Sequence, residues 1–299
     1  MNWEMVLALA IGMDLLLGEP RETFHPVVWI GKLIDAVRTH LNKSKLPGCA
    51  LALIITSIAA LGGYLCTLVH GVTGILISAY VLKSTFSITC LADTANMIGA
   101  HLENDDLEAA RKDLPMLVGR DPEQLSKKEM NSAVIESVAE NFVDGIISPL
   151  FYFVLFGLPG ALAYKAVNTL DSMAGYEHEG GVGYISARLD DLANYIPARL
   201  SMLFILAGAT FYASSRSALR ISKRDHALAK GPNPGWPMAA MAGALGISLK
   251  KPDHYILGKG FNLPETYHIK KAIHIMEMGT MFVIAMSFAM IHFIDLPLY

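Results

Sequence analysis

Three carboxylates stand at helical spacing in the middle of the chain. Glu136, Glu140 and Asp144 are four residues apart, so in a helix they project from one face. Like charges at this spacing repel one another, and the apolar stretch that follows them makes their desolvation costly. Binding of Mg²⁺ by such carboxylates together with substrate phosphates would offset the repulsion. The alternative interpretation is a solvated acidic face without a ligand.

A second polar stripe follows the next apolar stretch. Lys165, Asn168 and Asp171 recur every three residues, which places a cation, an amide and a carboxylate along one side of a helix. Such a set beside a membrane segment indicates a site for a phosphate and a metal ion. The alternative is that Lys165 only extends its ammonium group toward the membrane surface.

Two further segments carry polar residues with more than one interpretation. Arg188 and Asp191 are three residues apart, and Asp190 and Asn194 are four apart, a spacing that also suits a structural salt-bridge network. Prolines and glycines surround Asn233 and predict a non-helical loop whose amides could bind an anion. Neither GxxxxGK[ST] nor GxGxxG occurs, so any ATP would bind without a P-loop or a Rossmann turn.

The elements that position these residues must be largely apolar. Of the 299 residues, 53% are hydrophobic and only 17% are charged, and the mean hydropathy is +0.40. This composition excludes a disordered chain and indicates a membrane protein. The net charge of −3 gives no basic field for nucleic acid. The three cysteines have no CxxC spacing, which argues against a zinc site or a disulfide framework.

The longest apolar stretch is too long for one membrane crossing. No Asp, Glu, Lys or Arg occurs from Leu46 to Leu82, and one helix of that length would span about 55 Å, against a hydrocarbon core of about 30 Å. We therefore expect a helical hairpin that breaks near His70 and Gly71, with its second arm running toward Cys90. Lys83 would lie at an end of a segment and extend its ammonium group to the surface.

The sequence therefore predicts an all-α, polytopic integral membrane protein with polar helical loops, organised as one domain over residues 1–299. Within the fourth of its segments, Gly157 to Gly160 predict a break. The first segment is either a half-embedded helix or a short span. The six expected embedded segments are residues 5–17, 47–69, 72–91, 146–164, 200–215 and 278–294.

Longer motifs distributed along the chain resemble the CobD/CbiB family of cobalamin biosynthesis, the membrane-bound adenosylcobinamide-phosphate synthases. They follow the family's order over nearly the whole chain. The motifs are Leu16–Pro20, His25–Val27, Gly119–Asp121, Glu136–Asn141, Tyr164–Met173, Ala187–Asp191, Ile196–Arg199 and Ala239–Leu245.

This resemblance implies an ATP-dependent amide ligation in the cell membrane. It would join aminopropanol phosphate or threonine phosphate to adenosylcobyric acid, with Mg²⁺ as cofactor, and give adenosylcobinamide phosphate. The expected partners are these substrates, ATP and the lipid bilayer, without nucleic acid; a homo-oligomer is left open.

The roles that the resemblance implies fall into three groups. Magnesium would be held by Glu136, Glu140, Asp144 and Asp171. Phosphates and substrate would be held by Arg120, Lys165, Asn168, Arg188, Asn194, Arg199 and Asn233. Proton transfer from the attacking amine would fall to His25 or Asp191.

Two other classes of function use the same residue types. A metal-dependent membrane phosphotransferase also places carboxylates at helical spacing beside a bilayer, but it makes no amide. A corrinoid transporter or sensor would use the polar segments for binding alone. A new amide bond in the product separates the ligase from both alternatives.

Overall fold

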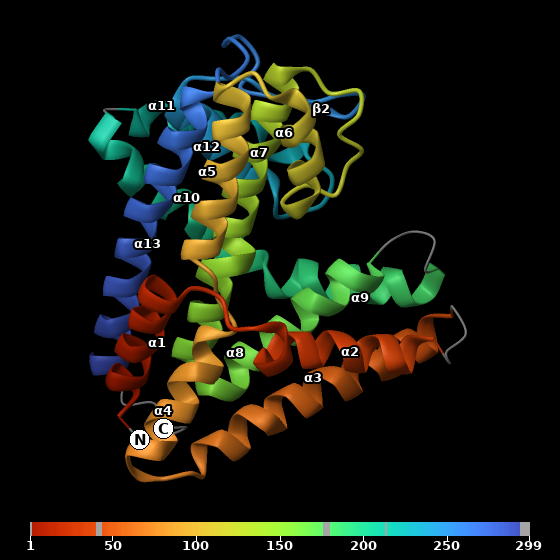
Figure 1. Ribbon diagram of the computed structural model, residues 1–299, viewed down its shortest axis with the longest axis vertical. Coiled ribbons are helices and arrows are strands. Elements are labelled where there is room, and N and C mark those ends of the chain that lie inside the picture. Colours follow the sequence, from red (N-terminus) through yellow and green to blue (C-terminus); the bar gives the residue numbers. More distant parts are fainter. Residues whose placement is uncertain (1, 40–43, 176–179, 213, 294–299) are drawn as a thin grey trace. The chain divides into compact units, whose positions relative to one another are not determined.

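The computed structural model describes residues 2–39, 44–175, 180–212 and 214–293 (Figure 1). Over these residues the fold is helical, as the sequence predicts, apart from one short hairpin of strands β1 (Leu249–Lys251) and β2 (Tyr255–Leu257). The chain forms two compact units. The first comprises Met1–Ser87, Asp144–Asn194 and Ile284–Tyr299, and the second comprises Ile88–Val143 and Tyr195–Val283.

The first unit is built mainly from six helices. Helix α3 packs along α8 and α9, and α1 packs against α4 (Figure 1). The helices are α1 (Trp3–Leu17), α2 (Pro26–Arg38), α3 (Lys45–Thr67), α4 (Gly71–Lys83), α8 (Ser148–Ala174) and α9 (Gly180–Ala193). The 3₁₀ turn η1 (Glu22–Phe24) precedes α2, and the π-helical turn η3 (Val143–Ile147) leads into α8.

The second unit holds the hairpin and most of the remaining helices. Helix α12 packs on α11, α10 and α7, and β1 packs on α7. The helices are α5 (Thr89–Glu103), α6 (Leu107–Asp113), α7 (Lys127–Phe142), α10 (Tyr195–Ala209), α11 (Ser215–Asp225), α12 (Gly235–Leu245) and most of α13 (Tyr267–Phe293). The 3₁₀ turns are η2 (Leu114–Met116), η5 (Thr210–Tyr212) and η6 (His226–Leu228).

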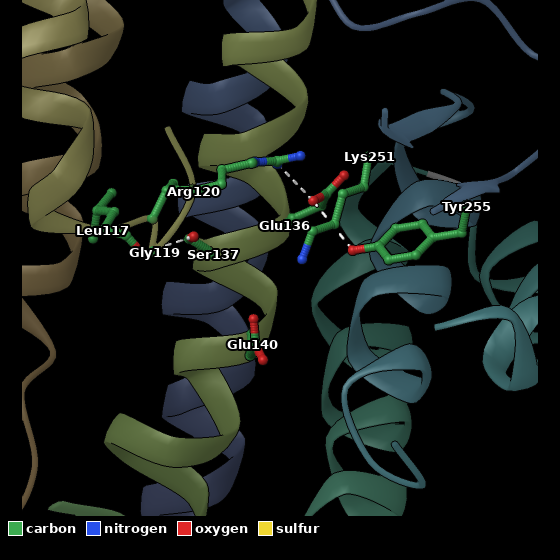
Figure 2. A pocket seen from close by; sticks show the side chains of 9 residues that line it. Leu117, Gly119, Arg120, Glu136, Ser137, Glu140, Lys251 and Tyr255 are labelled. Atoms are coloured by element: carbon green, nitrogen blue, oxygen red, sulfur yellow. Dashed lines mark hydrogen bonds and ion pairs between the residues drawn. The ribbon is translucent and has the colours of Figure 1, made fainter. Parts of the chain in front are cut away.

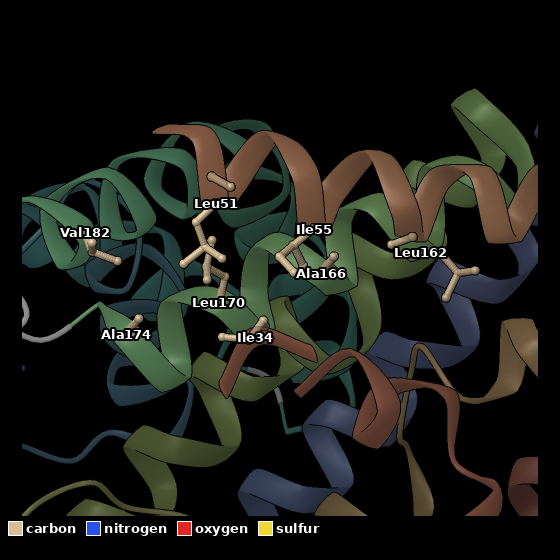
Figure 3. Close-up of a cluster of buried hydrophobic side chains, with 10 residues drawn as sticks. Ile34, Leu51, Ile55, Leu162, Ala166, Leu170, Ala174 and Val182 are labelled. Atoms are coloured by element: carbon tan, nitrogen blue, oxygen red, sulfur yellow. The ribbon is translucent and has the colours of Figure 1, made fainter. Parts of the chain in front are cut away.

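The core of the first unit lies where α2, α3, α8 and α9 meet (Figure 3). Ile34, Leu51, Ile55, Leu170 and Val182 are buried there. Removing these side chains from contact with water or lipid headgroups fixes α8, and so fixes the direction in which its polar stripe points.

Among the described residues, four helical runs are long and apolar enough to cross a membrane: Lys45–Thr67, Lys127–Ala174, Tyr195–Tyr212 and Tyr267–Phe293. Helix α4 is apolar but shorter. Large apolar side chains of α3, among them Leu53, Ile58, Leu61 and Leu65, are exposed on the outside of the protein. A continuous apolar outer face of this kind suits lipid tails, so the predicted polytopic membrane fold is confirmed.

Both predicted breaks are present in the first unit. Helix α3 ends at Thr67 and α4 begins after His70. Gly157 leaves the helical conformation with φ 64° and ψ −159°, which kinks α8. Only glycine adopts this conformation without a steric cost.

The second arm of the hairpin differs from the prediction in two respects. Helix α4 ends at Lys83 and does not run on toward Cys90. The hydroxyl groups of Ser84 and Thr85 donate to carbonyls of the last turn, and the Ser87 amide donates to the carbonyl of Gly145, so the backbone is satisfied without further helix. Lys83 is buried, 2% exposed, and does not extend to a surface.

We predict that Gly63→Ala destabilises the first unit. A Cβ at Gly63 would lie 2.8 Å from the Cα of Pro159. To relieve this clash, the backbones of two packed helices would have to separate, which disrupts their packing. Overpacking of this kind costs about 1 to 3 kcal/mol of unfolding free energy. The control is Gly62→Ala on the same helix, where a Cβ meets nothing within 4 Å. Thermal unfolding in detergent should show a lower midpoint for Gly63→Ala alone, and equal midpoints would contradict the packing.

Candidate functional site

A buried ion network joins the first and fourth helices of the first unit. The Lys83 Nζ lies 3.2 Å from the Asp14 Oδ1 and 2.8 Å from the Glu19 Oε1. Asp14 is 0% exposed and Lys83 is 2% exposed. Charges this deep persist only when they are paired, so this network fixes α4 to α1 and to the segment that follows α1. No sequence spacing signalled it, because Lys83 is far along the chain from Asp14 and Glu19.

His25 completes this network on the side of Glu19. Its Nε2 lies 3.1 Å from the Glu19 Oε2, and its Nδ1 accepts a hydrogen bond from the Val27 amide at the start of α2. Burial opposes ionisation of Glu19, but hydrogen bonds from His25, Lys83 and Ser87 outweigh it and lower the pKa of Glu19 to about 2. Both ring nitrogens of His25 are therefore engaged, and its role in proton transfer stays a prediction.

The polar stripe on α8 contacts α9 within the same unit. Lys165 donates to the Asn168 Oδ1 at 3.1 Å, and Asn168 donates to an Asp190 oxygen at 3.4 Å. Lys165 also interacts electrostatically with Asp144, Glu19 and Asp190. The stripe is thus a connected network of charges and not a row of separate surface groups.

Asn194 connects the end of α9 to this network. Its Oδ1 accepts from the Ser148 hydroxyl at 2.6 Å and the Tyr164 hydroxyl at 2.9 Å, and its Nδ2 donates to the Asp190 Oδ2 at 2.9 Å. Burial raises the pKa of Asp190, so this carboxyl group holds a proton more readily than an exposed aspartate. The structure therefore brings Lys165, Asn168 and Asn194 together. Asp190, for which the spacing with Asn194 was noted but no site role was predicted, joins the same network.

Three other predicted residues of this unit are Arg188, Asp191 and Asp171. Arg188 and Asp191 form an ion pair of 3.2 Å at positions i and i+3, which matches the salt-bridge interpretation. Burial raises the pKa of Asp191, although Arg188 opposes the shift. Asp171 lies in the last turn of α8, with its carboxylate against the backbone of Gly175.

The second unit contains a polar cavity of about 170 Å³, which we call the Arg120 pocket (Figure 2). Arg120 donates to the Glu136 Oε2 at 2.8 Å, and the Tyr255 hydroxyl donates to the same oxygen at 3.3 Å. Ser132 donates to the Glu136 Oε1 at 2.9 Å. Glu136 is thus held by three donors. The cavity is lined by Leu117, Val118, Gly119, Arg120, Glu136, Ser137, Glu140, Lys251 and Tyr255.

The β-hairpin supplies one wall of the Arg120 pocket. Lys251 and Tyr255 are directly paired across the two strands, so their side chains stand on the same face of the hairpin. Burial, with the nearby Glu136 and Glu140 carboxylates, raises the pKa of Tyr255 well above its ordinary value, so its hydroxyl stays a hydrogen-bond donor. Sequence reasoning missed both residues, and the turn residues Pro252 and Asp253 were the only signal for this hairpin.

Arg199 and Asn233 are also brought together within the second unit. Arg199 donates to the Asn233 Oδ1 at 3.2 Å and to the Tyr195 carbonyl at 2.6 Å. Its guanidinium lies 3.5 Å from the centre of the Tyr195 ring. The predicted non-helical loop is confirmed, because Gly231 has φ 92° and α12 begins only at Gly235.

The four predicted magnesium ligands are divided between the units. Glu136 and Glu140 belong to the second, and Asp144 and Asp171 belong to the first. Over the described part of the chain, no group of three or more His, Cys, Asp or Glu side chains is placed to hold a metal ion. Mg²⁺ often takes only one or two carboxylates beside substrate phosphates. A magnesium site shared by these carboxylates stays a prediction.

Helical runs long enough to cross a bilayer, with paired charges buried in the first unit and a polar cavity in the second, define a polytopic membrane protein with internal polar sites. The family model described as CobD/Cbib protein matches residues 7–278. The chain belongs to the CobD/CbiB family, and this membership supports a role in cobalamin synthesis.

Curated relatives agree with this assignment. A probable cobalamin biosynthesis protein CobD of Methanothrix thermoacetophila is 43% identical over 289 residues, 90% of each chain. One from Methanothermobacter thermautotrophicus is 40% identical over 85% of this chain and 86% of its own. The cobalamin biosynthesis protein CobD of Dehalococcoides mccartyi is 39% identical over 88% of this chain and 89% of its own. No solved structure matches the chain.

We predict that Lys83→Met lowers the unfolding free energy by about 3 to 5 kcal/mol, because it leaves buried carboxylates without their cation. Adding Asp14→Asn should recover part of this loss. The control is Lys32→Met, which changes an exposed lysine of α2 and should stay within about 0.5 kcal/mol of the parent protein. If chemical unfolding in detergent gives Lys83→Met and Lys32→Met the same stability, the buried network is wrong.

Proposed function

We propose that the chain catalyses an ATP-dependent amide ligation in the cell membrane. A propionate of adenosylcobyric acid would be joined to the amine of aminopropanol phosphate, or of threonine phosphate, to give the phosphorylated amide. The observation that carries this proposal is the Arg120 pocket, where cations, carboxylates and a phenol line one cavity in a chain of the CobD/CbiB family.

The chemistry explains why such a site needs positive charge. A carboxylate does not react with an amine until one of its oxygens is made a leaving group. Transfer of the terminal phosphoryl group of ATP to that oxygen gives an acyl phosphate and ADP. The amine nitrogen then attacks the carbonyl carbon, the bond to the phosphate oxygen breaks, and the nitrogen loses a proton. Phosphates must be neutralised and water excluded throughout.

The residues of the chain would divide these tasks. Arg120 in the second unit and Lys165 with Asn168 in the first supply donors for phosphate oxygens. Asp191 and His25 are both candidates to accept the proton of the amine, and both already have partners, Arg188 for Asp191 and Glu19 with the Val27 amide for His25. The raised pKa of Asp191 makes it a stronger base than an ordinary aspartate.

Magnesium fits this proposal as a partner of the phosphates. Glu140 lines the Arg120 pocket, and one carboxylate beside phosphate oxygens is a common arrangement for Mg²⁺. When bound, the ion would neutralise charge on the transferred phosphoryl group. Glu136 fits less well as a direct ligand, because its two oxygens already accept three hydrogen bonds.

Product analysis tests the proposed function. The purified chain in nanodiscs would be supplied with adenosylcobyric acid, aminopropanol phosphate, ATP and Mg²⁺. The proposal expects one amide, one ADP and one phosphate per turnover, measured by mass spectrometry and nucleotide chromatography. A phosphotransferase would transfer a phosphoryl group or release pyrophosphate without an amide, and a transporter or sensor would bind corrinoid without consuming ATP. Either result would overturn the proposal.

We predict that Lys165→Ala weakens the binding of a phosphorylated substrate. Losing one charge-assisted hydrogen bond costs about 1.5 to 3 kcal/mol, so half-saturation should rise about tenfold to a hundredfold. Aminopropanol phosphate and ATP would be titrated separately, to show which of them Lys165 binds. The control is Lys32→Ala on the exposed face of α2. Unchanged half-saturation for both substrates in Lys165→Ala, with normal turnover, would remove Lys165 from the site.

A further inference from the structure

We propose that Arg120 and Lys251 form a subsite for a single phosphoryl group in the Arg120 pocket, with Lys251 as a substrate-binding residue. The inference deepens the proposed function, on which it relies for the identity of the phosphorylated ligand. The subsite itself follows from the cavity and from two cations whose donors are not fully used by the protein.

Arg120 keeps one side of its guanidinium available. The Nη2 donates to Glu136 at 2.8 Å, but the Nη1 is buried and has no hydrogen-bond partner among the described residues. A buried donor without an acceptor destabilises the folded protein, because it has lost its hydrogen bond to water and gained none. The planar fork of arginine matches the oxygens of a phosphate. A phosphoryl oxygen at the Nη1 would supply the absent acceptor.

Lys251 faces the same cavity because of strand alternation. The preceding residue, Lys250, is directed to the other face and forms an ion pair of 2.9 Å with Glu129 of α7. Lys251 lines the pocket, and within the described part of the chain its ammonium group forms neither a hydrogen bond nor an ion pair. Its one recorded interaction is electrostatic, with Glu136. Figure 2 shows Arg120 and Lys251 on the two sides of Glu136.

The size of the cavity limits what can bind. Its volume of about 170 Å³ is well below the roughly 300 to 1,000 Å³ of pockets that enclose a drug-sized ligand. A nucleotide therefore cannot enter as a whole, but a phosphoryl end group can. Two sources offer that chemistry, namely the terminal phosphate of ATP and the phosphate ester of the amine donor.

A purely structural role for Lys251 makes a different prediction. Lys251 interacts electrostatically with Glu136, and in a structural role it would serve only to balance the charge of that carboxylate. In that case Glu136→Gln would remove the need for Lys251, and phosphate binding would not depend on it. The phosphoryl subsite instead requires the ammonium group whether or not Glu136 is charged.

The experiment measures binding of inorganic phosphate to the full chain in nanodiscs, by isothermal titration and by the rise in unfolding temperature, against sodium chloride of equal ionic strength. For Lys251→Met we expect the dissociation constant to rise about tenfold to a hundredfold and the thermal stabilisation by phosphate to disappear. Lys250→Met is the matched control, since it removes the neighbouring lysine outside the cavity, and it should bind phosphate like the parent protein. Lys251→Arg keeps the charge and should retain most of the binding.

Three outcomes would overturn the subsite. These are equal loss of phosphate binding in Lys251→Met and Lys250→Met, no loss in either variant, or full recovery of binding in the double variant Lys251→Met/Glu136→Gln. The titration is then repeated with ATP and with aminopropanol phosphate. The ligand whose binding is weakened in Lys251→Met is the one whose phosphoryl group occupies the subsite. Amide formation is measured separately. If phosphate binding depends on Lys251 but no amide product forms, the proposed ligase activity is refuted. If the amide forms but phosphate binding does not depend on Lys251, only this subsite is refuted.

Discussion

The cost of placing charges inside an apolar helical framework is the constraint on which the rest of the structure depends. A charge taken out of water is tolerated only with a partner, and even then the pair seldom adds net stability over well-packed apolar residues. The first unit meets this constraint by pairing Lys83 with Asp14 and Glu19, and the second pairs Arg120 with Glu136. At Arg120 and Glu136, leucine and methionine would fill the same volume without this cost, so the charges of this second pair are better explained by binding than by folding.

The two ion networks differ in how completely they are satisfied, and that difference suggests different tasks. Around Lys83, Glu19 accepts from Lys83, His25 and Ser87, so the network fixes α1, α4 and the start of α2 in place. Around Glu136 the carboxylate is satisfied, but the Nη1 of Arg120 and the ammonium of Lys251 are not paired within the described structure. The first network therefore resembles a support for neighbouring elements, and the second resembles a site that is completed by an anion.

Local features of this protein were predictable from its sequence, whereas pairings between distant segments were not. The hairpin break at His70 and Gly71, the kink at Gly157 and the loop before α12 each follow from the residue types at that position. The early end of α4 was missed because the amide of Ser87, just beyond the helix, donates to the carbonyl of Gly145, which is far along the chain. The pairing of Lys83 with Asp14 and Glu19, and the place of Lys251 in the Arg120 pocket, were missed because they depend on other elements, and one sequence does not show which elements meet. The division of the predicted magnesium ligands between two units was equally invisible.

The charges of the Arg120 pocket serve binding and not stability. The double variant Arg120→Met/Glu136→Gln removes both charges and keeps one acceptor oxygen, which can serve Ser132 or Tyr255 but not both. The measurement is the unfolding midpoint together with the dissociation constant for phosphate, both in nanodiscs. We expect a midpoint close to that of the parent protein and phosphate binding weakened at least about tenfold, which corresponds to the loss of one charge-assisted contact. A protein that unfolds far more readily but still binds phosphate with parental affinity would contradict it.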